Sequence, residues 1–185
     1  TRDLGLNFKP DASKGFECYC DADFSGNWNK ALAPVDPSTA KSRSGWIIFY
    51  AGCPVCWASK LQTQVALSTT EAEYIAMSMA LRDVIPVMNL IKEIKSKGFS
   101  VICNKPHVYC KVFEDNSGAL ELARLPKLRP RTKHINVCYH HFREHVRNGL
   151  IKIFPIDTKD QIADTLTKAL AQNSFIKLRK FMCGQ

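Results

Sequence analysis

Apolar positions in this chain alternate over short runs and recur every three to four residues over longer ones, which predicts strands mixed with helices. In order, the predicted elements are strands at 16–22, 44–51 and 54–60, helices at 69–84 and 86–97, a strand at 108–114, a helix at 116–124, a basic loop at 125–133, a helix at 134–148, a strand at 149–156 and a helix at 160–171. Three antiparallel strands followed by alternating helices and strands predict an α/β fold, with a five-stranded mixed sheet flanked by helices.

Glycine and proline set several of these boundaries. The segment Ala51–Pro54 separates two predicted strands and predicts a hairpin. Pro86 interrupts a long helical pattern and should break or kink the helix there, because proline lacks a backbone N–H. The stretch from Asn27 to Arg43 contains two prolines and several small residues, and is typical of a surface loop.

The composition indicates a single domain in a reducing environment. A length of 185 residues with 45% hydrophobic content is enough for one buried core. No apolar run approaches the roughly 18 residues of a membrane span, and no secretory signal opens the chain, so no membrane partner is expected. Eight cysteines without a regular framework favour free thiols. A zinc site of Cys53 and Cys56 with Cys18 and Cys20 is an alternative, but a one-residue spacing suits adjacent strand faces poorly.

Four acidic residues lie where an element ends or turns inward. Asp21 ends the first strand, Asp115 follows another strand, Glu73 lies on a helix, and Asp164 lies in the first turn of a later helix. Carboxylates near a core are costly unless they hold protons or cations. Their hard oxygen atoms suit Mg²⁺, and two such ions can drive in-line displacement at a phosphodiester. The four acids are therefore candidates for one metal site.

The helical period separates two neighbouring glutamates. At about 100° per residue, Glu73 falls on the same stripe as Met77, Ala80 and Val84, whereas Glu71 points roughly the opposite way, among exposed positions. Glu73 is therefore expected on the packing face. The alternative is a carboxylate that reaches past the core edge to an arginine or a backbone cap.

The net charge of +9 is concentrated in the second half of the chain. Between positions 124 and 152 a single acid, Glu144, accompanies eight basic residues: Arg124, Lys127, Arg129, Arg131, Lys133, Arg143, Arg147 and Lys152. Near a carboxylate cluster, this concentration favours a phosphate backbone as the partner, with a merely solvated surface as the alternative.

His134, Cys138, His141 and His145 recur at helical spacing and could bind zinc, but apolar neighbours favour a structural role.

Five segments, in order, resemble the ribonuclease H domain of copia-type LTR retrotransposon Pol polyproteins. They are Tyr19–Asn27, Leu67–Tyr74, Asp115–Ala119, Arg131–Ile135 and Gln161–Lys168. The resemblance implies a ribonuclease H-like fold over residues 15–172, preceded by the tail of an upstream reverse transcriptase or connection region at 1–14 and followed by a basic C-terminal tail at 173–185. It also implies metal-dependent cleavage of the RNA strand of RNA–DNA hybrids during reverse transcription.

The same resemblance assigns residues to roles. The family's metal-binding carboxylates fall on Asp21, Glu73, Asp115 and Asp164, which selects Asp21 over Asp23 and Asp164 over Asp160, two choices that pattern leaves open. The expected cofactor is two Mg²⁺ ions, with Mn²⁺ as a substitute. Asn27, Thr69 and Thr70 match positions that contact the hybrid in cellular ribonucleases H. The concentration of positive charge, and not the resemblance, makes Lys127, Arg129, Arg131 and Lys133 the expected contacts to the nucleic-acid backbone.

Two departures from the family pattern stand out. Cellular ribonucleases H carry a histidine in the loop before the last helix, whereas residues 157–160 contain none. Asn136 stands where related domains often have aspartate. Neither departure removes a metal ligand. Retroelement copies also decay or are domesticated, so a catalytically silent or domesticated nucleic-acid-binding module of the same fold is the alternative function. The expected location is intracellular, in a cytoplasmic virus-like particle if the element is active.

Overall fold

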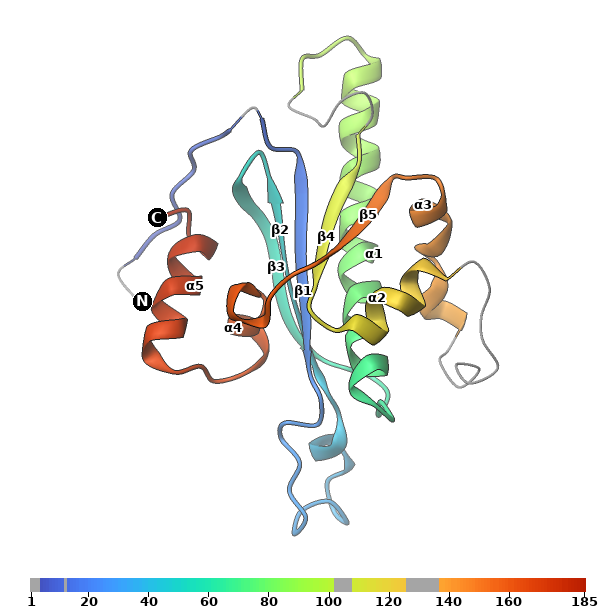
Figure 1. Ribbon diagram of the computed structural model, residues 1–185, viewed down its shortest axis with the longest axis vertical. Coiled ribbons are helices and arrows are strands. Elements are labelled where there is room, and N and C mark those ends of the chain that lie inside the picture. The colour runs from blue at the N-terminus through green and yellow to red at the C-terminus, as the bar shows by residue number, and fades with distance from the viewer. Residues whose placement is uncertain (1–3, 12, 102–107, 126–136) are drawn as a thin grey trace.

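Five strands form one mixed sheet, in the order β3-β2-β1-β4-β5 (Figure 1). The structure is a computed structural model that describes residues 4–11, 13–101, 108–125 and 137–185. Its strands are β1 (Phe16–Asp23), β2 (Arg43–Tyr50), β3 (Cys53–Leu61), β4 (Cys110–Glu114) and β5 (Ile151–Pro155). β1, β2 and β3 are antiparallel neighbours, while β1–β4 and β4–β5 are parallel pairs. The predicted α/β fold with a five-stranded mixed sheet is confirmed.

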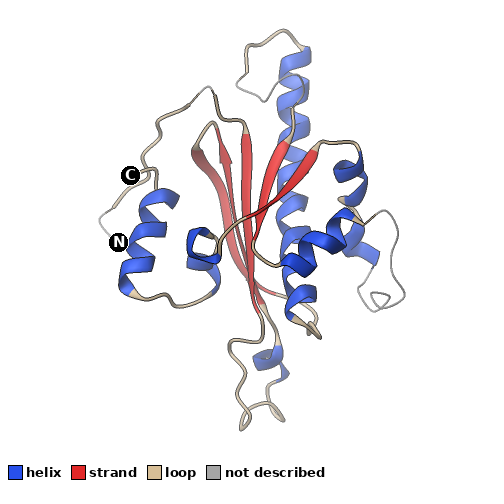
Figure 2. Cartoon of the chain, viewed as in Figure 1, coloured by secondary structure: helices blue, strands red, loops and turns tan. Residues whose placement is uncertain are grey.

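Helices cover both faces of this sheet (Figure 2). They are α1 (Thr69–Ser96), α2 (Ser117–Arg124), α3 (Arg143–Arg147), α4 (Asp164–Thr167) and α5 (Gln172–Met182), with short 3-10 turns η1 (Pro37–Ala40), η3 (Val137–His140) and η4 (Thr158–Asp160). Because side chains alternate along β1, Cys18 and Cys20 enter the larger core beneath α1 and α2, whereas Tyr19 enters a smaller core beneath α4. The two cores hold the helical layers at fixed positions over the sheet.

The predicted hairpin forms between β2 and β3. Ala51 and Gly52 connect the strands with φ angles of 52° and 75°. Positive φ at both central residues is the backbone of a turn whose twist matches that of the strands, and glycine adopts it without strain.

Helix α1 is continuous through Pro86, so the predicted break at this residue is wrong. Pro86 lies on the exposed side of α1, where water can satisfy the carbonyl group that loses its N–H partner. Asp83, one turn earlier, accepts a hydrogen bond from the indole N–H of Trp46 on β2 at 2.9 Å, which anchors the helix to the sheet.

By length and composition α1 could also cross a membrane, but half of its most apolar stretch is buried in this fold, as in the core helix of a globular domain.

The C-terminal third differs from the sequence prediction. The helix predicted at 134–148 is represented, within the described residues, by η3 and the five-residue α3. The helix predicted at 160–171 contracts to η4 and the four-residue α4, and a new helix, α5, follows. The spacing of Phe175, Leu178 and Met182 is the helical signal that could have located α5. Much of the predicted basic tail is therefore helical and packs beside the sheet.

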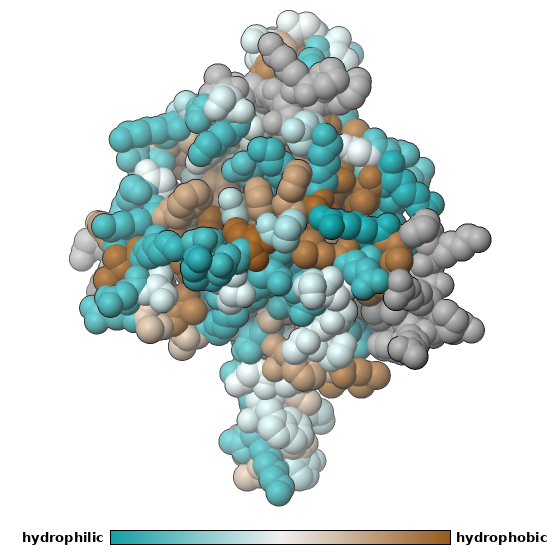
Figure 3. Space-filling model, viewed as in Figure 1, coloured by the Kyte–Doolittle hydropathy of each residue, from teal (hydrophilic) through white to brown (hydrophobic). Residues whose placement is uncertain are grey.

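The predicted loop between β1 and β2 projects beyond the end of the sheet (Figure 1). Its base is closed by hydrogen bonds from Ser25 Oγ to Ala40 O, at 2.8 Å, and from Ser25 N to Ser42 Oγ, at 3.2 Å. In the space-filling view, most of the projection is hydrophilic or of intermediate hydropathy (Figure 3). Residues before β1 run beside the end of α5, where the N–H of Asn7 donates to the carbonyl of Cys183 at 2.8 Å. The proposed domain limits at 14 and 172 stay predictions.

Candidate active site

Asp21 and Asp115 lie at the carboxyl ends of adjacent parallel strands. The pairing of β1 with β4 ends two residues before each acid, so the strands separate there. The side-chain amide of Gln161 bridges the opening and donates to the carbonyl oxygens of Cys20, at 2.9 Å, and Phe113, at 3.4 Å. Open α/β sheets place ligands at such a point, where the strand order changes direction.

The start of α1 brings a third carboxylate to this opening. Ser68 caps the helix, because its hydroxyl accepts a hydrogen bond from the N–H of Glu71 at 3.1 Å. Two residues later, Glu73 is buried against the sheet with 7% of its surface exposed. One oxygen atom from each of Asp21, Glu73 and Asp115 lies within 4.8 Å of the others. The structure therefore brings these three predicted residues together.

A glycine on β2 lets α4 bring the fourth acid next to Asp21. Gly45 pairs with Asp21, and a Cβ atom on Gly45 would lie only 2.7 Å from Cγ2 of Thr167. The close approach allows the Thr167 hydroxyl to donate to Oδ2 of Asp21. The ammonium group of Lys168 lies 2.8 Å from Oδ1 of Asp164 and 3.6 Å from Oδ1 of Asp21. Asp164 is thereby brought next to Asp21, with the Lys168 ammonium in contact with both carboxylates.

Burial makes ionisation of these acids costly. Burial, together with the nearby charges of Glu114 and Asp21, raises the pKa of Glu73 to about 11. Burial also raises the pKa of Asp164 to about 7, although the ion pair with Lys168 opposes the shift. At neutral pH, a carboxyl group shifted as far as that of Glu73 holds its proton, and that of Asp164 holds one part of the time, unless a cation takes the place of the proton.

A fifth carboxylate, Glu114, was missed by the sequence reasoning. It is fully buried at the end of β4, and burial raises its pKa to about 8. One of its oxygens accepts a hydrogen bond from the N–H of Asn116 at 3.1 Å, and the other lies 3.4 Å from the Cys20 thiol. The alternation of Cys110, Val112 and Glu114 on one strand face was the available signal.

The expectation that Glu71 is exposed is wrong. Its side chain is 6% exposed, and its carboxylate accepts a hydrogen bond from the N–H of Leu67 at 2.8 Å. The Ser68 hydroxyl accepts from the Glu71 N–H, and the Glu71 carboxylate accepts from the Leu67 N–H, so the two side chains satisfy backbone N–H groups at the start of the helix, much as in a capping box. A helical wheel cannot show a side chain that folds back onto the chain before its own helix.

The donor set fits a hard divalent cation. Oε2 of Glu73 is buried and has no hydrogen-bond partner among the described residues. An unsatisfied buried carboxylate oxygen is expensive, and this one belongs to the group whose oxygens converge within 4.8 Å. An oxygen-only ligand set is the one that Mg²⁺ prefers.

Two other metal sites were considered from the sequence: the histidine stripe lies partly outside the described residues, because His134 is not among them, and the cysteine site does not form within them. In the part of the chain that the structure describes, Asp21, Glu73 and Asp115 form the only group of three or more His, Cys, Asp or Glu side chains spaced to hold a metal. Cys53 and Cys56 are free thiols. His140 and His141 instead contact α1, through Tyr74 Oη at 2.7 Å and Ser78 Oγ at 3.4 Å, respectively.

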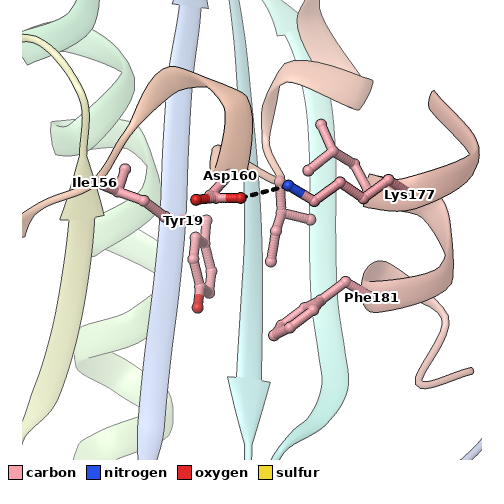
Figure 4. A pocket seen from close by; sticks show the side chains of 7 residues that line it. Tyr19, Ile156, Asp160, Lys177 and Phe181 are labelled. Carbon is pink, nitrogen blue, oxygen red and sulfur yellow. Dashed lines mark hydrogen bonds and ion pairs between the residues drawn. The ribbon is translucent and has the colours of Figure 1, made fainter. Parts of the chain in front are cut away.

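Asp160 lies away from the carboxylate cluster. Its carboxylate pairs with Lys177 of α5 at 2.5 Å, at the edge of a pocket beside the sheet that Tyr19, Ile156 and Phe181 also line (Figure 4). The choice of Asp164 over Asp160 therefore agrees with the position of each side chain.

The predicted nucleic-acid contacts are placed in part. Asn27 and Thr69 are exposed, and Thr70 is half-buried, with its hydroxyl 3.4 Å from Oδ1 of Asn116. Lys127, Arg129, Arg131 and Lys133 lie outside the described residues.

Three other members of the basic run have structural contacts. Arg124 donates to the Ile153 carbonyl, buried Arg143 donates to the Leu125 carbonyl, and the Lys152 ammonium lies 4.1 Å from the centre of the Tyr109 ring. Part of the positive charge between positions 124 and 152 therefore stabilises the fold.

Comparison with known proteins identifies relatives along most of this sequence. The chain is 32% identical over 175 residues, 95% of its length, to the retrovirus-related Pol polyprotein from transposon RE2 of Arabidopsis thaliana. It is 36% identical over 157 residues, 85% of its length, to the corresponding polyprotein from transposon TNT 1-94 of Nicotiana tabacum. The chain spans about a tenth of each polyprotein, 11% and 10% respectively. No protein-family model matches.

The chain is homologous to transposon Pol polyproteins and has a ribonuclease H fold. The fold is shown by the N-terminal RNase H domain of a Mycobacterium tuberculosis protein, with a TM-score of 0.53 and 11% identity over 90% of this chain and 96% of that one. A compost-derived RNase H1 gives a TM-score of 0.54 and 15% identity over 88% and 96% of the two chains. The same compost-derived enzyme in complex with an RNA/DNA hybrid gives a TM-score of 0.50.

Proposed function

We propose that this domain is a metal-dependent ribonuclease H that hydrolyses the RNA strand of RNA–DNA hybrids during reverse transcription of a retrotransposon. The observation that carries the proposal is the convergence of Asp21, Glu73 and Asp115, and it is supported by Oε2 of Glu73, which is buried without a hydrogen-bond partner among the described residues. The Pol homology and the ribonuclease H fold support nucleic-acid hydrolysis of this type.

The carboxylates divide into two overlapping groups. Asp21, Glu73 and Asp115 would hold one Mg²⁺ or Mn²⁺ ion, and Asp21 with Asp164 would hold a second. Bound there, divalent ions supply a water of lowered pKa and stabilise the departing oxygen. Asp21 is held from α4 by the Thr167 hydroxyl, and Asp115 by the Thr158 hydroxyl at 2.7 Å.

No side-chain nucleophile is needed in this reaction. Water adds to the phosphorus, the bond to the 3′ oxygen breaks, and the products are a 5′-phosphate and a 3′-hydroxyl. The fixed carboxylates contribute by positioning, because preorganised groups need little rearrangement during the reaction. Asn27, Thr69 and Thr70 are proposed to contact the hybrid. A hydrogen bond from one of these side chains to an RNA 2′-hydroxyl would give selectivity for RNA.

The proposed setting is a larger Pol chain with reverse transcriptase upstream, inside a cytoplasmic virus-like particle if the element is active. The relatives support the polyprotein context, because this chain matches about a tenth of each.

A labelled RNA–DNA hybrid provides the test of function. We expect cleavage of the RNA strand in Mg²⁺ or Mn²⁺, no cleavage in EDTA, and no cleavage of matched RNA–RNA or DNA–DNA duplexes, measured by gel electrophoresis. End-group analysis should show a 5′-phosphate and a 3′-hydroxyl. Salt-sensitive binding of the hybrid without cleavage in either metal would instead identify a silent nucleic-acid-binding module.

Replacing Lys127, Arg129, Arg131 and Lys133 with glutamine should weaken hybrid binding and flatten its salt dependence. Each lost phosphate contact releases fewer counter-ions and should reduce the logarithmic salt slope by roughly one. Binding to RNA–DNA and DNA–DNA duplexes should weaken alike, because a phosphate contact does not read the sugar. Fluorescence anisotropy across a salt series measures both effects.

The matched control replaces Lys92 and Lys97, which lie near the C-terminal end of α1, whereas Glu73 lies near its N-terminal end. This variant should keep the wild-type slope. An unchanged slope in the fourfold variant would show that these residues form a solvated surface.

A further inference from the structure

Lys168 gives the carboxylate cluster a cation that belongs to the chain itself. It follows α4 directly, and its backbone N–H donates to the Asp164 carbonyl at 3.2 Å, which fixes the start of the side chain. Its ammonium group then lies 2.8 Å from Oδ1 of Asp164 and 3.6 Å from Oδ1 of Asp21. Lys168 therefore spans the two acids assigned to the second metal position.

The surroundings distinguish this contact from an ordinary surface ion pair. The Asp21 and Asp164 side chains are 1% and 5% exposed, whereas the Lys168 side chain is 37% exposed. The two acids therefore depend on a nearby positive charge, while the lysine can move into solvent. Thr167 donates to the other oxygen of Asp21, so consecutive residues hold both oxygens of one carboxylate.

The two sides of Asp21 differ in their counter-ions. Among the ion pairs of the described residues, Lys168 supplies the only cation in contact with the cluster, and it lies on the Asp164 side. On the Glu73 side, Oε2 of Glu73 has neither a hydrogen-bond partner nor an ion pair within the same described residues, whereas Oδ1 of Asp164, which also lacks a hydrogen bond of good geometry, has the Lys168 ammonium at 2.8 Å. One metal position therefore lacks a positive group, while a tethered ammonium covers the other.

We propose that Lys168 is a displaceable internal counter-ion that holds Asp21 and Asp164 together in the metal-free protein and makes divalent-ion binding sequential. The first ion binds between Asp21, Glu73 and Asp115. An ion between Asp21 and Asp164 binds only when the ammonium swings away, so its affinity is lowered by competition. The inference rests on the proposed function for the existence of two ion positions, and it concerns the order of binding and not the cleavage step.

Lys168→Met tests the proposal without nucleic acid and without an activity measurement. In EDTA the variant should melt roughly 5 °C or more below the wild type, because two buried carboxylates lose their cation. In saturating Mg²⁺ most of this deficit should disappear, since the ion replaces the lost charge. In calorimetric titrations with Mn²⁺, the weaker of two binding events should become tighter by roughly tenfold or more, because its competitor is gone.

Two further variants make the result specific. Lys159→Met removes an exposed ion pair with Asp157, and should change the melting temperature by about 1 °C or less in either condition. Lys168→Arg retains the positive charge, and should restore the wild-type melting temperature in EDTA and the weak second binding event. Arginine rescue would separate the charge of residue 168 from a simple packing role.

Three results would overturn the inference. Equal melting of Lys168→Met and wild type in EDTA would show that the lysine is not a counter-ion, and a deficit unchanged by Mg²⁺ would assign it a purely structural role. Unaltered Mn²⁺ binding in Lys168→Met, with two ions still bound, would refute the competition while leaving the proposed function intact. A wild-type protein that binds no divalent ion would refute both.

Discussion

Glu73→Gln is expected to lower the rate of hybrid cleavage by roughly a thousandfold, whereas Glu71→Gln should retain most of the activity. A metal ligand supports several kcal/mol of transition-state stabilisation, and each 1.36 kcal/mol corresponds to a tenfold change in rate. Glutamine at position 73 keeps the shape of the side chain but cannot supply the charge. Single-turnover cleavage of a labelled hybrid in Mg²⁺ measures the difference.

Glu71 is a close control, because the two glutamates are two residues apart, both are buried, and they have different partners. Glu71 accepts a hydrogen bond from the Leu67 N–H, and a glutamine oxygen can accept the same bond. Melting in EDTA checks the fold of both variants. Glu73→Gln should melt at or above the wild-type temperature, because Glu73 is already protonated at neutral pH without metal. Equal loss of cleavage in the two variants would contradict the assignment of Glu73 as a ligand.

The metal-free protein is expected to lose stability as the pH rises from about 5 to 8. The pKa values of Asp164, Glu114 and Glu73 are raised to about 7, about 8 and about 11, above the ordinary values of 3.8 for aspartate and 4.5 for glutamate. In this window the folded state holds protons that the unfolded state has released. The associated stability is complete below the ordinary values and is lost as the pH rises through the raised ones. Each such proton lowers the unfolding free energy by about 1.4 kcal/mol per pH unit.

Bound metal should reverse this trend. Divalent ions bind the deprotonated carboxylates, so Mg²⁺ affinity should rise over the same pH range and offset the loss of stability. Melting curves from pH 5 to 9, in EDTA and in saturating Mg²⁺, provide the comparison. The Glu73→Gln variant should show a shallower decline in EDTA, because one of the three protons is removed from the balance. A wild-type melting temperature that rises from pH 5 to 8 in EDTA would show that these acids are ionised in the folded protein.

The sequence pattern alone correctly predicted the features that depend on a single helix or strand. The stripe of Glu73, Met77, Ala80 and Val84 is buried as predicted, because the helical period alone decides which residues share a face. The ends of β1 and β4 were located within a few residues by their apolar runs. Since parallel strands end at the same edge, the meeting of Asp21 and Asp115 followed from those runs together with the sheet order.

Tertiary structure decided what depends on contacts between distant segments. Glu71 lies inside because its carboxylate folds back to the Leu67 N–H, and Pro86 stays within α1 because its side of the helix faces solvent. The place of Asp164 depends on Gly45, which lies more than a hundred residues earlier in the chain and lets α4 approach β1.

The sequence by itself determined the fold class, the likeness to a Pol polyprotein domain and which acids to consider, because periodicity and motif order are local properties of the chain. Only the tertiary structure decided that Glu114 is buried beside them and that Lys168 reaches two of them. Burial and electrostatic pairing depend on distances across the sheet, and residue spacing along the chain does not specify those distances.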